Sequence, residues 1–189
     1  MKAGMKQDEP IKIAVLAMGG QGGAVLCNWL IQTAERCHCF AQSTSVPGVA
    51  QRTGATIYYI EIFPHSDKTD KKPMPALMPV PGHVDVVVAG ELIESGRAIL
   101  RGLVTPDRTT TIVSTHRDYA IAEKAAIGDG RVDSHKLIEQ GKKHSKTFIG
   151  FDMASLAEEN ESVISSILFG TIAAAGVLPF EKAEFEAVI

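Results

Sequence analysis

The strongest constraint on the fold is a short apolar run near the N-terminus that ends abruptly in glycines. Residues 11–17 are apolar except for one lysine, and Gly19-Gly20-Gln21-Gly22-Gly23 follows almost at once. A short apolar run bounded by turn residues is typical of a strand that is buried on both faces. Apolar residues then recur at helical spacing over residues 22–39. The sequence therefore predicts a buried strand, a tight turn and a helix, in that order.

Strands and helices alternate along the rest of the chain. We expect strands at residues 40–43, 55–63, 84–89, 109–114 and 146–151. We expect helices at residues 91–101, 118–126 and 133–144, and helical structure from residue 152 to the end. The strand at 40–43 would complete a βαβ unit with the first strand and helix. This alternation predicts an α/β fold: a Rossmann-like open, mostly parallel sheet with helices on both faces.

The length of 189 residues favours a single domain, residues 1–189. Residues 64–82 hold five of the nine prolines, and proline disrupts both helix interiors and central strands, so we expect a long surface excursion there. Residues 1–10 should form a flexible N-terminus. The end at Ile189, with no cap and no polar tail, suggests a fragment of a longer polypeptide.

Composition excludes several function classes. The 19 Lys and Arg residues against 22 Asp and Glu residues give a net charge of −3, which excludes a polycationic nucleic-acid binder. The charge-free run at 162–180 holds serines, glycines and a proline, so we expect a buried helix and no membrane contact. Three cysteines are too few for the four thiolates of an iron–sulfur cluster. We expect a cytoplasmic chain with reduced thiols and no metal of its own.

The glycine turn is the first candidate site. Gly19, Gly20, Gln21 and Gly22 lead into a helix N-terminus, whose unpaired N–H groups suit a phosphate. A dinucleotide site also needs an acidic residue at the end of the second strand, and none is present there. Three interpretations stay open: a phosphate-bearing ligand or a partner's cofactor, a weaker case for NAD(P), and glycines that only let the helix pack closely on the strand.

A polar segment at residues 43–54 is the second candidate site, and we expect it to be a loop. In an open α/β sheet the carboxyl ends of the strands line the ligand crevice. Arg52 could hold a carboxylate or phosphate with two donors, or pair with a local carboxylate. The candidate binding or interface residues are Ser45, Val46, Gln51, Arg52, Thr53 and Gly54.

Two further patterns carry little weight. Gly128-Asp129-Gly130 resembles the start of a thiamine diphosphate motif, but a helix-like segment precedes it instead of a buried strand. Cys37-His38-Cys39 lacks the second ligand pair of a tetrahedral metal site.

His116 follows a predicted strand end, so it could face the crevice.

The two candidate sites together resemble the gamma-type subunit of 2-oxoacid:ferredoxin oxidoreductases. The sequence Gly-Gly-Gln-Gly follows the first strand, and residues 43–61 read Ser-Thr-Ser-Val-Pro-Gly-Val-Ala-Gln-Arg-Thr-Gly-Ala-Thr-Ile-Tyr-Tyr-Ile-Glu. The closest similarity is to the beta subunit of indolepyruvate ferredoxin oxidoreductase. It is strong across residues 11–63 and weaker through residues 84–91 and 167–180.

The resemblance implies a domain that supports chemistry carried out by a partner. Such a partner holds thiamine diphosphate, Mg²⁺ and [4Fe-4S] clusters. The complex oxidatively decarboxylates a 2-oxoacid, of the indolepyruvate, aryl pyruvate or pyruvate type, to an acyl-CoA and passes electrons to ferredoxin. The family's motifs fall on Gly19, Gly20, Gln21 and Gly22, and on Gln51, Arg52 and Gly54.

The resemblance also bears on what the chain binds. It implies an inactive isolated chain with no firmly bound cofactor, and coenzyme A at the interface with the partner. The isolated chain could form a homodimer. Two alternative functions stay open: an NAD(P)-binding oxidoreductase, and a non-catalytic nucleotide- or coenzyme A-binding module.

Overall fold

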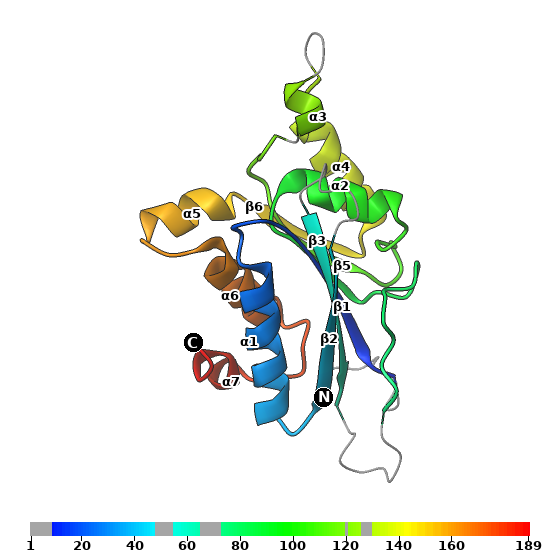
Figure 1. The fold of residues 1–189 in the computed structure, drawn as a ribbon, viewed down its shortest axis with the longest axis vertical. Coiled ribbons are helices and arrows are strands. Elements are labelled where there is room, and N and C mark those ends of the chain that lie inside the picture. The colour runs from blue at the N-terminus through cyan, green and yellow to red at the C-terminus, as the bar shows by residue number, and fades with distance from the viewer. Residues whose placement is uncertain (1–8, 48–54, 65–72, 120, 126–129) are drawn as a thin grey trace.

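The computed structural model describes residues 9–47, 55–64, 73–119, 121–125 and 130–189. One six-stranded sheet has the order β2-β3-β1-β4-β5-β6 (Figure 1). Its strands are β1 (Ile11–Met18), β2 (Phe40–Pro47), β3 (Ala55–Phe63), β4 (Val86–Ala89), β5 (Thr110–Ser114) and β6 (Thr147–Phe151). The helices are α1 (Gly23–Arg36), α2 (Leu92–Leu100), α3 (Ile121–Lys124), α4 (Ser134–His144), α5 (Met153–Glu159), α6 (Ile164–Ala175) and α7 (Lys182–Glu186). The predicted open α/β sheet is confirmed.

The sheet is mixed, because β3 runs against its two neighbours. Strands β1, β4, β5 and β6 pair in parallel, whereas β3 is antiparallel to both β1 and β2. The predicted βαβ unit is therefore split: β2 runs parallel to β1, but β3 lies between them. Most of β3 is apolar and buried, so an inner position suits it. The polar strand β2 occupies the edge, where its side chains can reach water.

The loop predicted at residues 43–54 is wrong in its first part. Residues 43–47 continue β2, with Ser43 paired to Ile60 and Val46 paired to Ile57. Pairing with β3 satisfies the backbone of this segment, and an edge strand tolerates polar side chains, so their polarity was misleading. Residues 48–54 lie outside the described residues.

Helices cover both faces of the sheet (Figure 1). Ile13, Val15 and Ile60 point to the face covered by α1, α6 and α7. Ala14 and Leu16 point to the opposite face, toward α2. This alternation along β1 is expected for an inner strand, because successive side chains of a strand point to opposite faces of the sheet.

The C-terminal region is helical, as predicted, and consists of the three helices α5, α6 and α7. Asp152 begins α5, where its Oδ1 accepts a hydrogen bond of 3.0 Å from the backbone N–H of Ser155. Gly176 ends α6 in the left-handed conformation, with φ of 57°. The helix predicted at residues 118–126 is shorter, with only α3 at Ile121–Lys124. In the described part of the proline-rich excursion, residues 73–82 form neither helix nor strand, as predicted. Among the described helices, none has the length and apolarity that a membrane span requires.

Candidate functional site

The glycine turn lies at the edge of the sheet where parallel strands end. Strands β1, β4 and β5 are parallel neighbours, so the segments that follow them meet at this edge. The glycine turn follows β1, Gly90 and Glu91 follow β4, and residues 115–118 follow β5. In open α/β proteins this carboxyl edge is the usual place for a ligand.

Gln21 crosses this edge and uses both ends of its side-chain amide within the chain. Its Oε1 accepts a hydrogen bond of 2.9 Å from the backbone N–H of Met18, and its Nε2 donates one of 3.1 Å to Asp118 Oδ2. A Cβ atom at Gly90 would lie only 2.3 Å from Gln21 Oε1. The Gln21 side chain therefore passes over the end of β4, from the turn after β1 to the loop after β5. We call this arrangement the Gln21 strap.

Gly22 and Gly23 allow close packing at the start of α1. Gly20 and Gly22 have φ of 88° and 69°, a region that favours glycine. A Cβ at Gly22 would lie 2.7 Å from Ser165 Oγ, and one at Gly23 would lie 2.6 Å from Ala17 Cβ and 2.7 Å from Tyr58 Cε2. By contrast, a Cβ at Gly19 or Gly20 would meet nothing within 4 Å, so the outer side of the turn is open.

The N-terminus of α1 is free of local caps. The N-cap residue of α1 is Gly22, which has no side chain to accept a hydrogen bond from the first-turn N–H groups. The first turn of α1 also carries no acidic residue. The first-turn N–H groups and the positive end of the helix dipole therefore keep their capacity to bind an anion. Close packing thus accounts for Gly22 and Gly23, while anion binding at the turn stays a prediction.

We expect Gly23→Val to destabilise the fold by about 1–3 kcal/mol, because the added side chain has no room between α1 and β1. Gly19→Ala is the matched control in the same turn. The space around Gly19 is open, so we expect a change below about 0.5 kcal/mol. Urea denaturation of both variants measures the two values. Equal effects of the two substitutions would contradict the close approach of α1 to β1.

A second group of polar side chains lies at the carboxyl end of β5. Ser114 Oγ lies 2.7 Å from His116 Nδ1, and His116 Nε2 lies 3.5 Å from Asp118 Oδ2. The order resembles a Ser-His-Asp triad, but Ser114 is fully buried and its Oγ accepts a hydrogen bond of 3.0 Å from the N–H of Met153. A buried hydroxyl that is held from both sides cannot act as an accessible nucleophile. Its position instead fixes the orientation of the imidazole ring.

Sequence reasoning placed only His116 near this edge and missed Ser114 and Asp118. The three residues are alternate positions that start at the last residue of β5, and that spacing was the one local signal. The contact between Asp118 and Gln21 joins positions 97 residues apart in the chain. Such a contact is invisible to local patterns, because it depends on the order of strands in the sheet.

Glu91 is a fully buried carboxyl group at the end of β4. Burial raises the pKa of Glu91 to about 7, although backbone hydrogen bonds and the Arg117 guanidinium act to lower it. The Nε of Arg117 lies 3.7 Å from Glu91 Oε2. Arg117 also pairs with Glu123 and donates a hydrogen bond of 2.8 Å to the carbonyl of Val132. Arg117 thus ties the segment after β5 to the edge of the sheet.

The second candidate site is only partly described. Ser45 and Val46 lie in the edge strand β2, opposite Tyr58 and Ile57 of β3, and Ser45 is exposed. The other members, Gln51, Arg52, Thr53 and Gly54, lie outside the described residues, as do Gly128 and Asp129. The three cysteines, Cys27, Cys37 and Cys39, are free thiols. Within the described part of the chain, no three His, Cys, Asp or Glu side chains are grouped so as to hold a metal ion.

These features define a class of protein. The chain is a Rossmann-like α/β domain whose carboxyl edge carries a glycine turn, but the strand that follows the first helix has no acidic residue for a dinucleotide ribose. The chain belongs to the pyruvate ferredoxin/flavodoxin oxidoreductase family, whose sequence pattern matches residues 12–189. As a member of that family, it is a component of an oxidoreductase that acts on an oxo group.

Solved structures of other proteins share the fold, and three of them are compared with this chain. The pyruvate oxidoreductase subunit PORC from Thermotoga maritima has a TM-score of 0.59 and 18% identity, over 95% of this chain and 83% of that one. The gamma subunit of a keto/oxoacid ferredoxin oxidoreductase from Geobacter sulfurreducens has a TM-score of 0.59 and 12% identity, over 94% and 83%. The 2-oxoglutarate:ferredoxin oxidoreductase from Magnetococcus marinus has a TM-score of 0.56 and 13% identity, over 95% of this chain and 26% of that one.

The predicted resemblance to gamma-type subunits is confirmed by these matches and by the family. The finer similarity to the indolepyruvate enzyme stays a prediction. A comparison with curated proteins gives no match.

Proposed function

We propose that this chain is the non-cofactor subunit or domain of a thiamine-diphosphate-dependent 2-oxoacid:ferredoxin oxidoreductase. The observation that carries the proposal is the family match over residues 12–189. The complex would convert a 2-oxoacid and coenzyme A into an acyl-CoA and CO₂, with two electrons passed to ferredoxin. The substrate class we favour is indolepyruvate or another aryl pyruvate, with pyruvate as the second choice. We place the complex in the cytoplasm.

The residues of this chain do not fit the redox centres. Three thiols cannot supply the four ligands of a [4Fe-4S] cluster, and the described residues offer no metal-binding group of side chains for Mg²⁺. We therefore assign thiamine diphosphate, Mg²⁺ and the clusters to a partner subunit. In the Magnetococcus marinus enzyme the shared fold covers only 26% of the chain, so there it is one part of a longer polypeptide.

The chain's own contribution would be to bind and orient an anionic group. The outer side of Gly19 and Gly20 is open, and the first-turn N–H groups of α1 lie beside it. These groups suit the phosphates of coenzyme A or the carboxylate of the 2-oxoacid. Arg52 and the remainder of the second candidate site would complete the interface with the partner.

Reconstitution tests the proposed function. The purified chain should show no turnover alone, and the chain with its thiamine-bearing partner should reduce ferredoxin with at least one of indolepyruvate, phenylpyruvate, pyruvate and 2-oxoglutarate. Turnover by the chain alone, or a reconstituted complex that oxidises none of the four acids, would overturn the proposal. Thermal stabilisation by micromolar NAD⁺ or NADP⁺ would favour the dinucleotide alternative, although the Gln21 strap occupies part of the edge where that cofactor would bind.

The proline-rich segment at residues 73–80 is the surface that we expect to contact the partner. Its exposed apolar side chains are Met74, Leu77, Met78 and Val80, which are between 51% and 92% exposed. The segment is uncharged, so burial against an apolar partner surface carries no charge-desolvation cost.

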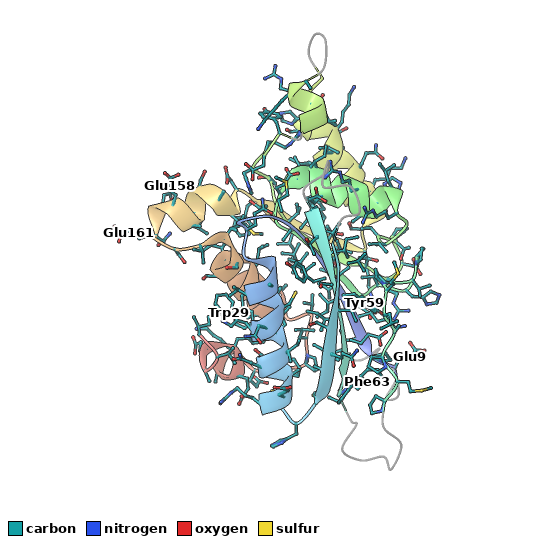
Figure 2. All side chains as sticks on the ribbon, viewed as in Figure 1. Glu9, Trp29, Tyr59, Phe63, Glu158 and Glu161 are labelled. Atoms are coloured by element: carbon teal, nitrogen blue, oxygen red, sulfur yellow. The ribbon has the colours of Figure 1, made fainter. Side chains whose placement is uncertain are left out.

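Specific hydrogen bonds hold this segment on the sheet. The N–H of Ala76 donates a bond of 2.8 Å to Oε2 of the buried Glu61, and Tyr59 donates one of 2.6 Å to the other oxygen of the same carboxylate. Thr44 Oγ1 donates a bond of 2.7 Å to the carbonyl of Leu77. Tyr59 lies on the side of the sheet away from α1 (Figure 2). A backbone anchored in this way presents its apolar side chains in a fixed arrangement.

We expect Leu77→Glu to abolish co-purification with the partner subunit while it leaves the melting temperature of the isolated chain unchanged. The Leu77 side chain is exposed in the isolated chain, so a charge there does not lower the free energy of unfolding. The charge becomes unfavourable only when the partner subunit covers it and removes its water. Ile189→Glu is the matched control, because Ile189 is equally exposed but follows α7 on the opposite face. Retained co-purification by Leu77→Glu would exclude residues 73–80 from the interface.

A further inference from the structure

We propose that Gln21 is a positioning residue that holds the glycine turn in a single arrangement and thereby sets the affinity of the site for its anionic ligand. The inference rests on the proposed function, in which the turn binds an anion, and it adds the element that organises the turn. Both amide atoms of the Gln21 side chain bind within the chain, Oε1 to the N–H of Met18 and Nε2 to Asp118, so we assign Gln21 a positioning role.

The far end of the strap is itself held in place. Asp118 Oδ2 is shared between Gln21 Nε2, at 3.1 Å, and His116 Nε2, at 3.5 Å. Ser114 Oγ accepts a hydrogen bond from the N–H of Met153 and lies 2.7 Å from His116 Nδ1. The Nε2 of the same ring faces Asp118 Oδ2. The network therefore connects the turn after β1 to the start of α5.

The turn needs such an anchor because of its composition. Gly19, Gly20 and Gly22 have wide backbone freedom, and ordering them when the ligand binds would cost free energy. A turn that is already ordered avoids this cost, so its N–H groups point at the ligand before it arrives. Loss of the strap should then weaken ligand binding more than it slows the chemical step, which takes place on the partner.

A set of four variants separates the strap from a general packing role. Gln21→Ala removes both hydrogen bonds. Asp118→Ala removes only the far anchor, whereas Asp118→Asn keeps an oxygen that can accept from Gln21 Nε2. The double variant Gln21→Ala/Asp118→Ala completes a double-mutant cycle, in which two residues of one unit give non-additive effects.

Two measurements are needed. Hydrogen exchange of the Met18 amide in the full chain reports the near anchor directly. We expect exchange to be accelerated about tenfold in Gln21→Ala and to be close to wild type in Asp118→Asn. Steady-state kinetics of the reconstituted complex should show a KM raised about tenfold in Gln21→Ala and Asp118→Ala, with kcat nearly unchanged, and no further increase in the double variant.

The kinetic outcome also identifies the ligand of the turn. A rise in the KM for coenzyme A assigns its phosphates to the turn, and a rise in the KM for the 2-oxoacid assigns the substrate carboxylate. Unchanged KM values for both, additive effects in the double variant, or wild-type Met18 exchange in Gln21→Ala would each overturn the inference. A wild-type complex that oxidises no 2-oxoacid would overturn the proposed function instead, and the exchange experiment would still test the strap.

Discussion

Replacement of Phe169 by alanine should lower the free energy of unfolding by about 3–5 kcal/mol, the range for loss of a buried aromatic ring. Phe169 is fully buried in α6. Its ring centroid lies 5.5 Å from that of Trp29 in α1 and 5.2 Å from that of Phe185 in α7. In Figure 2, Trp29 lies on the side of α1 where α6 packs. The truncation therefore leaves a cavity where three helices meet.

Urea denaturation followed by tryptophan fluorescence measures this effect, since Trp29 is the single tryptophan of the chain. Leu100→Ala is the control of similar size. Leu100 is 88% exposed at the end of α2, so we expect a change within about 0.5 kcal/mol. A loss below 1 kcal/mol in Phe169→Ala would contradict the packing of α6 against α1 and α7.

Replacement of Glu91 by glutamine should stabilise the protein at alkaline pH and leave it unchanged near pH 4. The pKa of Glu91 is raised from 4.5 to about 7 in the folded chain, chiefly by burial. At a pH between 4.5 and about 7, the Glu91 carboxyl group has lost its proton in the unfolded chain but keeps it in the folded chain. The free energy of unfolding of the wild type therefore falls as the pH rises through this window, and the fall is complete above about pH 7.

The two pKa values correspond to a loss of roughly 3 kcal/mol. Glutamine does not ionise, so Glu91→Gln should exceed the wild type by about this amount at pH 8. Urea denaturation at pH 4, 6 and 8 gives the profile. Glu158→Gln serves as the control, because Glu158 is exposed on α5 (Figure 2). A constant difference between Glu91→Gln and the wild type at all three pH values would show that Glu91 does not titrate in this range.

Most secondary structure was readable from local patterns. The apolar runs that became β1 and β4 exceed what a surface segment would carry, because an inner strand is buried on two faces. β3 was predicted from its β-branched and aromatic residues. The helices α1, α2 and α4 were also predicted from the sequence, α1 from the helical spacing of its apolar residues. The strand β2 was predicted too short, since its later residues are polar and only pairing with β3 makes them a strand.

The site was less predictable than the fold. The glycine turn was recognised from its residues, and the structure shows why Gly22 and Gly23 must be glycine: Ser165, Ala17 and Tyr58 occupy the space of a side chain. The role of Gln21 was not readable, because its partners become apparent only when β4 lies between β1 and β5.

The sequence by itself determined the succession of strands and helices along the chain, the sharp turn after β1 and the membership of the family. It could do so because burial patterns and motifs are local properties of the chain. Only the tertiary structure decided that β3 inserts between β1 and β2. It also decided that Asp118 meets Gln21 across the end of β4. The reason is physical: strand order and the contacts at strand ends are set by which apolar faces can be buried together, and that depends on the whole chain at once.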